Sequence, residues 1–211
     1  VDPLDIVNEY GADALRTYVL FMGDYGAAAP WNDSSVRGCK RFLERVAGLT
    51  DIMTEEPAAK DMEVKIHKAI KKVSSDIEAM KFNTAIACLM TLINEIYAVG
   101  KISKDDLVIF IKLLCPFAPH LCEEIWETIG GEGLLSLSQW PEYEESKTVE
   151  DSIEIGVQVN GKVRGTIVIP NGCAKALELA KKDERVASFL EGKTLVKEIY
   201  VPNKIVNFVA K

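Results

Sequence analysis

Apolar residues recur at three- and four-residue spacing along most of the first 130 residues, which is the pattern of amphipathic helices. The segment 82–99 is apolar on nearly all sides and stops at Gly100, so we expect it to be the central helix of a bundle. The other predicted helices span residues 4–10, 12–22, about 35–53, 60–80, 104–114 and 119–130.

Capping and turn residues support these limits. A cluster of Asn, Asp and Ser over residues 32–35 suits the start of a helix, and Pro119 suits the first helical position of another. The periodicity stops over residues 25–31, where Gly and Ala predict a loop. We therefore predict an all-α helix bundle over residues 1–141.

The hydrophobic period changes near residue 153 from helical spacing to strict alternation, with Ile153, Ile155 and Val157 on one face of the expected strand. Residues 131–152 have no consistent period, and we predict that they pack on the bundle and then form a linker over 142–152. Beyond the linker we predict a small α+β domain over residues 153–211, of order ββααββ. Its later elements are two short helices at 174–182 and 184–191 and two strands at 195–201 and 204–209.

Two registers are open to the first hairpin of this domain. A two-residue turn at Asn160-Gly161 pairs Val157 with Arg164 and brings charges onto the apolar face. A three-residue loop over 159–161, with Gly161 in the left-handed conformation, pairs Val157 with Val163 and leaves one face wholly apolar. We predict the three-residue loop. The polar face then carries Gln158, Lys162, Arg164 and Thr166.

The net charge of −7 is unevenly distributed. Residues 151–211 carry ten Lys and Arg against seven Asp and Glu, a net charge of +3, which leaves −10 for residues 1–150. Much of the acid lies in residues 123–150. Binding of an anionic partner such as RNA would therefore depend on local basic faces rather than on total charge.

The sequence gives little support for a membrane span, a secretory signal, paired cysteines or a metal site. Charged or polar residues interrupt every apolar run before the ~18–20 residues of a membrane span, so we expect a soluble protein. The start, Val1–Asp5, has no initiator Met and no secretory signal, and we expect a part of a longer chain. The five cysteines form no Cys-x-x-Cys pair and are expected to be reduced core residues of a cytoplasmic protein. His67 and His120 lack a second ligand at metal-site spacing, so we predict no metal site.

Several stretches resemble a known enzyme family. Tyr10–Arg16, Gly38–Val46 and Leu114–Trp126 are similar to the helical domain of the class I synthetases for leucine, isoleucine and valine. The stretches Val157–Gly165 and Ile199–Asn207 resemble the small C-terminal domain of bacterial-type leucyl-tRNA synthetases. The resemblance to this family covers essentially the whole chain. Asn203 stands where the family commonly has Gly in a Pro-Gly-Lys turn, and Asn tolerates the left-handed conformation that such a turn needs.

The resemblance implies a C-terminal part of a ligase that joins leucine to its tRNA, using ATP and Mg²⁺ in a catalytic domain. The family's His-Ile-Gly-His-type and Lys-Met-Ser-Lys-Ser-type elements do not occur in this sequence. We therefore assign no catalytic residue, and expect no cofactor in this chain and no aminoacylation by it alone. The expected partners are leucine-specific tRNA and the rest of the synthetase chain, and we expect a monomer.

Binding of tRNA needs cationic donors that meet phosphates. On the helix that begins near residue 35, Arg37, Arg41 and Arg45 form one stripe with Lys40 beside it, opposite an apolar face. The alternative is a solvated surface on which Glu44 makes ordinary ion pairs with the arginines. In the small domain the predicted tRNA-binding residues are Lys162, Arg164, Lys204 and Lys211.

Two other interpretations stay open. A second group, Lys65, Lys68, Lys71 and Lys72, is a weaker candidate because acidic residues lie close to it in the sequence. A competing interpretation of the whole chain is a helical protein-interaction module without an RNA role, which the acidic segment 123–150 favours.

Overall fold

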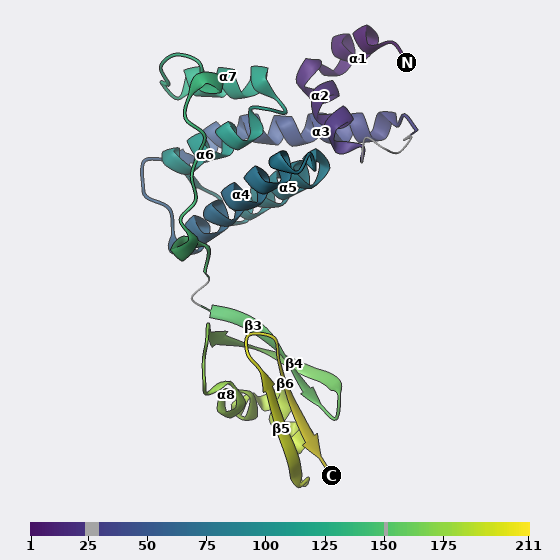
Figure 1. Cartoon of the computed structure of the whole chain (residues 1–211), viewed down its shortest axis with the longest axis vertical. Coiled ribbons are helices and arrows are strands. Elements are labelled where there is room, and N and C mark those ends of the chain that lie inside the picture. The colour runs from purple at the N-terminus through teal and green to yellow at the C-terminus, as the bar shows by residue number, and fades with distance from the viewer. Residues whose placement is uncertain (24–29, 150–151) are drawn as a thin grey trace. The chain divides into compact units, whose positions relative to one another are not determined.

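The computed structural model describes residues 1–23, 30–149 and 152–211, and it divides into a helical unit, Val1–Thr148, and a smaller unit, Val149–Lys211 (Figure 1). The predicted combination of a helical domain followed by a small domain of helices and strands is confirmed. The division between the units falls inside the predicted linker. Residues 150–151 of that linker and residues 25–29 of the predicted loop lie outside the described residues.

Seven α-helices lie in the described residues of the helical unit, close to the predicted segments. They are α1 (Pro3–Tyr10), α2 (Ala12–Phe21), α3 (Asp33–Ala47), α4 (Lys60–Glu78), α5 (Phe82–Val99), α6 (Lys104–Leu114) and α7 (Pro119–Thr128).

The helix predicted to run to about residue 53 ends earlier. The α-helical part stops at Ala47, and the chain continues as the 3₁₀ helix η1 (Gly48–Ile52). Close packing explains the change, because the Tyr97 hydroxyl donates to the Arg45 carbonyl oxygen at 2.8 Å. The same hydroxyl lies 2.9 Å from where a Cβ on Gly48 would be. The chain then forms the short strand β1 (Met53–Thr54), parallel to β2 (Ile102–Ser103).

The helix ends are capped by side chains that the sequence places there. Asn32 Oδ1 accepts from the Ser35 N–H at 3.2 Å, and Ser103 Oγ accepts from the Asp106 N–H at 3.1 Å. A long-range cap comes from α2: Asp13 Oδ2 accepts from the Leu121 N–H at 2.8 Å in the first turn of α7. This buried carboxylate therefore joins two helices that lie about a hundred residues apart in the sequence.

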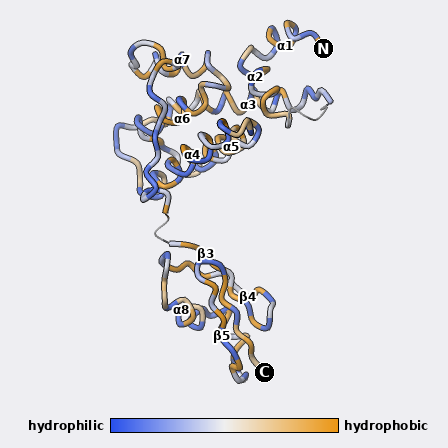
Figure 2. The backbone as a smooth tube through the Cα atoms, viewed as in Figure 1, coloured by the Kyte–Doolittle hydropathy of each residue, from blue (hydrophilic) through white to orange (hydrophobic). Residues whose placement is uncertain are grey.

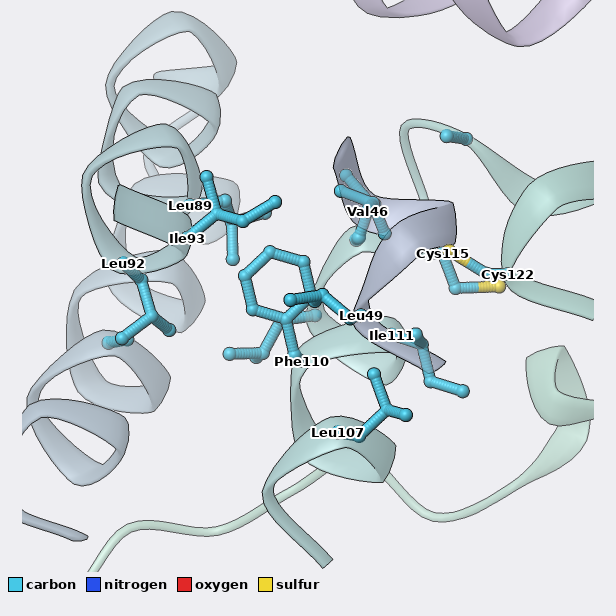
Figure 3. Close-up of a cluster of buried hydrophobic side chains, with 14 of the residues drawn as sticks. Val46, Leu49, Leu89, Leu92, Ile93, Leu107, Phe110, Ile111, Cys115 and Cys122 are labelled. Carbon is cyan, nitrogen blue, oxygen red and sulfur yellow. The ribbon is translucent and has the colours of Figure 1, made fainter. Parts of the chain in front are cut away.

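The core of the helical unit forms around α5, as its apolar surface predicts. Figure 3 shows the Phe110 ring of α6 between Leu89 and Ile93 of α5 and Leu49 of η1. Among the described helices, α5 is the one that is long and apolar enough to cross a membrane by length and composition. Its buried residues pack in the core of this unit, and core helices of soluble proteins pass the same test.

The small unit is a four-stranded sheet covered on one face by two short helices. Figure 2 shows hydrophobic segments in its strands β3 and β4. The strand order is β4-β3-β6-β5, in which β3 and β6 are parallel and the other neighbours antiparallel. Its elements are β3 (Ser152–Val159), β4 (Lys162–Pro170), α8 (Ala176–Lys182), α9 (Glu184–Leu190), β5 (Leu195–Val201) and β6 (Ile205–Ala210).

The predicted hairpin register is wrong. Asn160 (φ 51°) and Gly161 (φ 77°) form a two-residue turn, and Val159 pairs with Lys162. The register then shifts at Val157, which pairs with Gly165, so Arg164 is the extra residue of a β-bulge. The bulge restores the apolar face beyond it, where Ile155 pairs with Ile167. Uninterrupted alternation in β4 would exclude the shorter turn, but the bulge at Arg164 interrupts that alternation.

Candidate nucleic-acid interface

The predicted basic stripe lies on α3, opposite the buried residues of the helix. Arg37, Arg41 and Arg45 are exposed and Lys40 is half-buried. The opposite side packs into the core through Val36, Cys39, Phe42, Leu43 and Val46. The amphipathic division of this helix is therefore as predicted.

The partners of these cations are neutral groups. Lys40 Nζ donates to the Glu9 carbonyl oxygen at 3.4 Å and lies 5.8 Å from the centre of the Tyr10 ring. Arg45 donates to Asn94 Oδ1 at 2.7 Å and lies 4.9 Å from the centre of the Tyr97 ring. Neutral partners orient a cation without cancelling its charge, so the stripe keeps its positive charge.

The predicted alternative for this stripe was ion pairing with Glu44. Within the described residues no ion pair joins Glu44 to Arg37, Arg41 or Arg45. At the Arg37 end of the stripe, a hydrogen bond with Glu9 raises the pKa of Tyr10. Desolvation raises this pKa further, and Arg37 opposes the rise.

The lysines of α4 differ in this respect. Lys65 forms an ion pair with Glu95, Lys71 with Glu145 at 2.7 Å, and Lys72 with Asp76. Carboxylates thus neutralise Lys65, Lys71 and Lys72. The α4 surface is accordingly a poorer site for phosphate than the α3 surface.

In the small unit the sheet brings two of the predicted cations to one end. Lys162 follows the β3–β4 turn, and Asn160 of that turn hydrogen-bonds to Ala210, the residue before Lys211. Lys193 lies at the same end, because its neighbour Thr194 exchanges both backbone hydrogen bonds with Lys211. The sequence reasoning missed Lys193, and only the pairing of β5 with β6 would have identified it.

Lys204 lies at the opposite end of β6, in the turn between β5 and β6. Asn203 of this turn has a φ of 58°, the left-handed conformation that the sequence predicts. Its side chain holds the neighbouring loop, since Asn203 Oδ1 accepts from the Gly172 N–H at 3.2 Å. The structure therefore does not bring Lys204 together with Lys162 and Lys211.

Arg164 occupies a different place from the one predicted. Its guanidinium Cζ lies 4.4 Å from the centre of the Phe189 ring of α9, on the side of the sheet that the helices cover. The expected polar face that unites Arg164 with Gln158 and Thr166 is therefore not formed. The bulge in β4 explains the difference, since it turns Arg164 toward α9.

The described residues hold no candidate metal cluster, and three of their buried thiols are unreactive. No group of three His, Cys, Asp or Glu among them could hold a metal ion. Burial raises the pKa of Cys39 to about 11, and burial also raises the pKa of Cys115 and Cys122. These thiols are therefore protonated near neutral pH and are poor nucleophiles.

The chain matches known proteins over its whole length. Residues 59–179 match the family described as the anticodon-binding domain of tRNA ligase. Leucine–tRNA ligase of Alkaliphilus oremlandii is 45% identical over 214 residues, which cover 100% of this chain and 27% of that protein. Leucine–tRNA ligase of Chlorobaculum tepidum is 43% identical over 221 residues, with the same two shares.

A solved structure is similar as well. It is the crystal structure of the ternary complex of Agrobacterium radiobacter K84 agnB2 LeuRS with tRNA and LeuAMS. The TM-score is 0.82 at 33% sequence identity, and the match covers 100% of this chain and 30% of that one. The chain thus spans less than a third of the length of the proteins that it resembles.

Proposed function

Because the chain belongs to the anticodon-binding domain family of tRNA ligases, we propose that it is the tRNA-binding C-terminal region of a leucine–tRNA ligase. The match of the whole chain to ligases of that name supports this proposal. The complete enzyme attaches leucine to its tRNA with ATP and Mg²⁺ and works in the cytoplasm. This region supplies binding and has no catalytic, editing or cofactor site of its own.

One observation carries the proposal: no carboxylate pairs with the α3 stripe of Arg37, Lys40, Arg41 and Arg45 in the described residues, and the hydrogen bonds of Lys40 and Arg45 go to neutral groups. By contrast, carboxylates neutralise Lys65, Lys71 and Lys72 of α4. Phosphates need cations that are not already paired, and contacts to phosphates supply much of the affinity for nucleic acids. The stripe is exposed, so a tRNA backbone can reach it.

We assign a second contact to the small unit, taken as the ββααββ domain of residues 153–211 that follows the linker 142–152. Lys162 and Lys211 lie at one end of its sheet, and Lys204 lies at the other. We propose that Lys162 and Lys211 contact tRNA together and that Lys204 contacts a separate phosphate. Arg164 contributes charge near Lys162 while it rests on Phe189.

A salt titration of tRNA binding tests the proposal. The affinity of the chain for leucine-specific tRNA should fall steeply as salt rises, because each phosphate contact releases counterions. The purified chain should neither exchange pyrophosphate into ATP nor charge tRNA. Leucine-dependent exchange by this chain would contradict the assignment of a purely binding region.

The acidic segment 123–150 favours a second function, a protein-interaction module without an RNA role. The two functions differ at low salt, where the first gives measurable binding of tRNA. If circular dichroism shows that the chain is folded and it binds no tRNA at low salt, the protein-interaction module is the remaining function.

A further inference from the structure

A cavity of about 360 Å³ lies in the helical unit, away from the α3 stripe. Its walls come from α2, from the end of α6 with the connection to α7, and from the segment that follows α7. The lining includes Arg16, Lys112, Pro116, Pro119, Leu135 and Trp140.

Two cations line this cavity, and both use neutral partners. The Arg16 guanidinium donates one hydrogen bond to the Pro116 carbonyl oxygen at 3.1 Å, and Lys112 Nζ donates to the Gln139 carbonyl oxygen at 3.2 Å. These bonds fix the two side chains and leave further N–H donors of each free for a ligand. No Asp or Glu is among the described lining residues.

Two carboxylates bond to groups in or beside this wall. Asp13 bonds to His120 Nδ1 and to the Leu121 N–H, each at 2.8 Å. The two oxygens of Glu123 accept from the N–H groups of Leu135 at 2.7 Å and Ser136 at 2.9 Å. The lining therefore carries two cations and no carboxylate, and the two carboxylates behind the wall, which keep their negative charge, are held by hydrogen bonds outside the lining.

The rest of the wall suits a flat apolar group. Trp140 is about one-third exposed, and its ring is held by a hydrogen bond from Nε1 to Ser74 Oγ at 2.9 Å. Pro116, Pro119 and Leu135 complete the apolar lining. Aromatic rings are the usual stacking surface for nucleobases, and a volume of about 300 Å³ or more is typical of a small-molecule site.

We propose that this cavity binds one nucleotide, with its phosphate between Arg16 and Lys112 and its base on Trp140. The nucleotide is either a residue of a bound tRNA or a free nucleoside monophosphate, since both offer the same phosphate and base. The cavity is separate from the α3 stripe, because none of the four cations of that stripe lines it.

Titration of the full chain with adenosine 5′-monophosphate and uridine 5′-monophosphate tests the site, with tryptophan fluorescence and calorimetry as readouts. We expect saturable binding of a nucleotide that Lys112→Ala weakens about fivefold or more, because a charge-assisted bond is lost. Trp140→Ala should weaken the same binding. Lys101→Ala is the matched control, because Lys101 pairs with Glu56 outside the cavity and does not line it.

Parallel titrations with tRNA identify the source of the nucleotide. If a tRNA nucleotide fills the cavity, Lys112→Ala weakens tRNA binding more than Lys101→Ala does, and saturating monophosphate competes with tRNA. If a free nucleotide is the ligand, Lys112→Ala weakens monophosphate binding alone.

Arg16→Lys is a second variant that keeps the charge while changing the donor geometry, so it tests the site without loss of the cation. The proposal is overturned if neither monophosphate binds saturably and if Lys112→Ala and Lys101→Ala bind tRNA with equal affinity. The proposed tRNA function fails separately, through loss of all salt-dependent tRNA binding by the unmodified chain.

Discussion

Asn160 and Ala210 are joined by two side-chain hydrogen bonds. Asn160 Nδ2 donates to the Ala210 carbonyl oxygen, and Asn160 Oδ1 accepts from the Ala210 N–H, both at 2.9 Å. The amide thus imitates one more residue of the parallel pairing between β3 and β6. It also holds the turn with Lys162 close to the end with Lys211.

Replacement of Asn160 by Gly should destabilise the small unit by about 1–3 kcal/mol, because two hydrogen bonds to the backbone are lost while the left-handed φ is kept. Asn160→Ala should cost about 1 kcal/mol more, because Ala also disfavours a φ of 51°. Hydrogen exchange of the β6 amides in the full chain measures both. Equal protection in Asn160→Gly and the unmodified chain would show that these bonds contribute nothing.

Arg164 and Lys162 should behave differently although both are exposed cations of one hairpin. Lys162→Ala should weaken tRNA binding and leave stability within about 0.5 kcal/mol. Arg164→Ala should weaken binding and also cost about 0.5–1 kcal/mol, because the contact with Phe189 is lost. A double-mutant cycle with Phe189→Leu isolates that contact. A coupling energy of zero would contradict the stacking of Arg164 on Phe189.

Within the α3 stripe, Arg41 and Arg45 form a matched pair. Arg41 has no polar partner among the described residues, whereas Arg45 bonds to Asn94 and packs on Tyr97. Arg41→Ala should therefore reduce the salt dependence of tRNA binding by about one charge without a change in stability. Arg45→Ala should lower stability by about 1 kcal/mol as well. Salt titrations and denaturant unfolding separate the two effects, and an unchanged salt slope in Arg41→Ala would remove the stripe from the interface.

Glu123 should make the helical unit sensitive to acid. Desolvation raises the pKa of Glu123, but the hydrogen bonds that Ser136 and Leu135 donate outweigh it, so the net pKa is below the ordinary value of 4.5. A carboxylate with a lowered folded-state pKa stabilises the fold above 4.5, and that stabilisation is lost as the pH falls through the lowered pKa. Glu123→Gln should flatten the dependence of Tm on pH in this range. An equally steep acid dependence in the variant would assign the effect to other carboxylates.

Gly131 lies against the Trp126 ring, and a Cβ at this position would come within 2.1 Å of Trp126 Cδ2. Gly131→Ala should therefore cost about 1–3 kcal/mol, because the ring has to move. The cost should be smaller in a Trp126→Leu background, where the ring is absent. Denaturant unfolding of the unmodified chain, the two single variants and the double variant measures this coupling. Strictly additive changes in the free energy of unfolding would contradict the contact.

The sequence predicts the helices well because their caps are local. The cluster of Asn, Asp and Ser at 32–35 and Pro119 each mark a helix start within a few residues of the observed one. The early end of α3 could not be predicted, because it depends on Tyr97, a residue about fifty positions away. The bulge at Arg164 could not be predicted either, because nothing in the local alternation of β4 indicates the register shift.

The predicted site residues show the same limit. The stripe on α3 follows from helical periodicity, and the structure places it as expected. The neutral character of its partners does not follow from the sequence, because Tyr97 and Asn94 come from α5. Lys193 and the cavity cations Arg16 and Lys112 acquire their neighbours through pairings between distant segments. Local patterns therefore identify charges but not the groups that surround them.

The position of β6 inside the sheet affects how the protein is made. β6 lies between β3 and β5, although β3 and β4 leave the ribosome long before it. The β3 edge of the first hairpin therefore stays unpaired until β6 has been translated. Ala210 of β6 follows its partner Asn160 by 50 positions. An open strand edge invites pairing with other chains. We therefore expect a pause of the ribosome before β6 to leave this edge open for longer and to lower the yield of folded protein through aggregation.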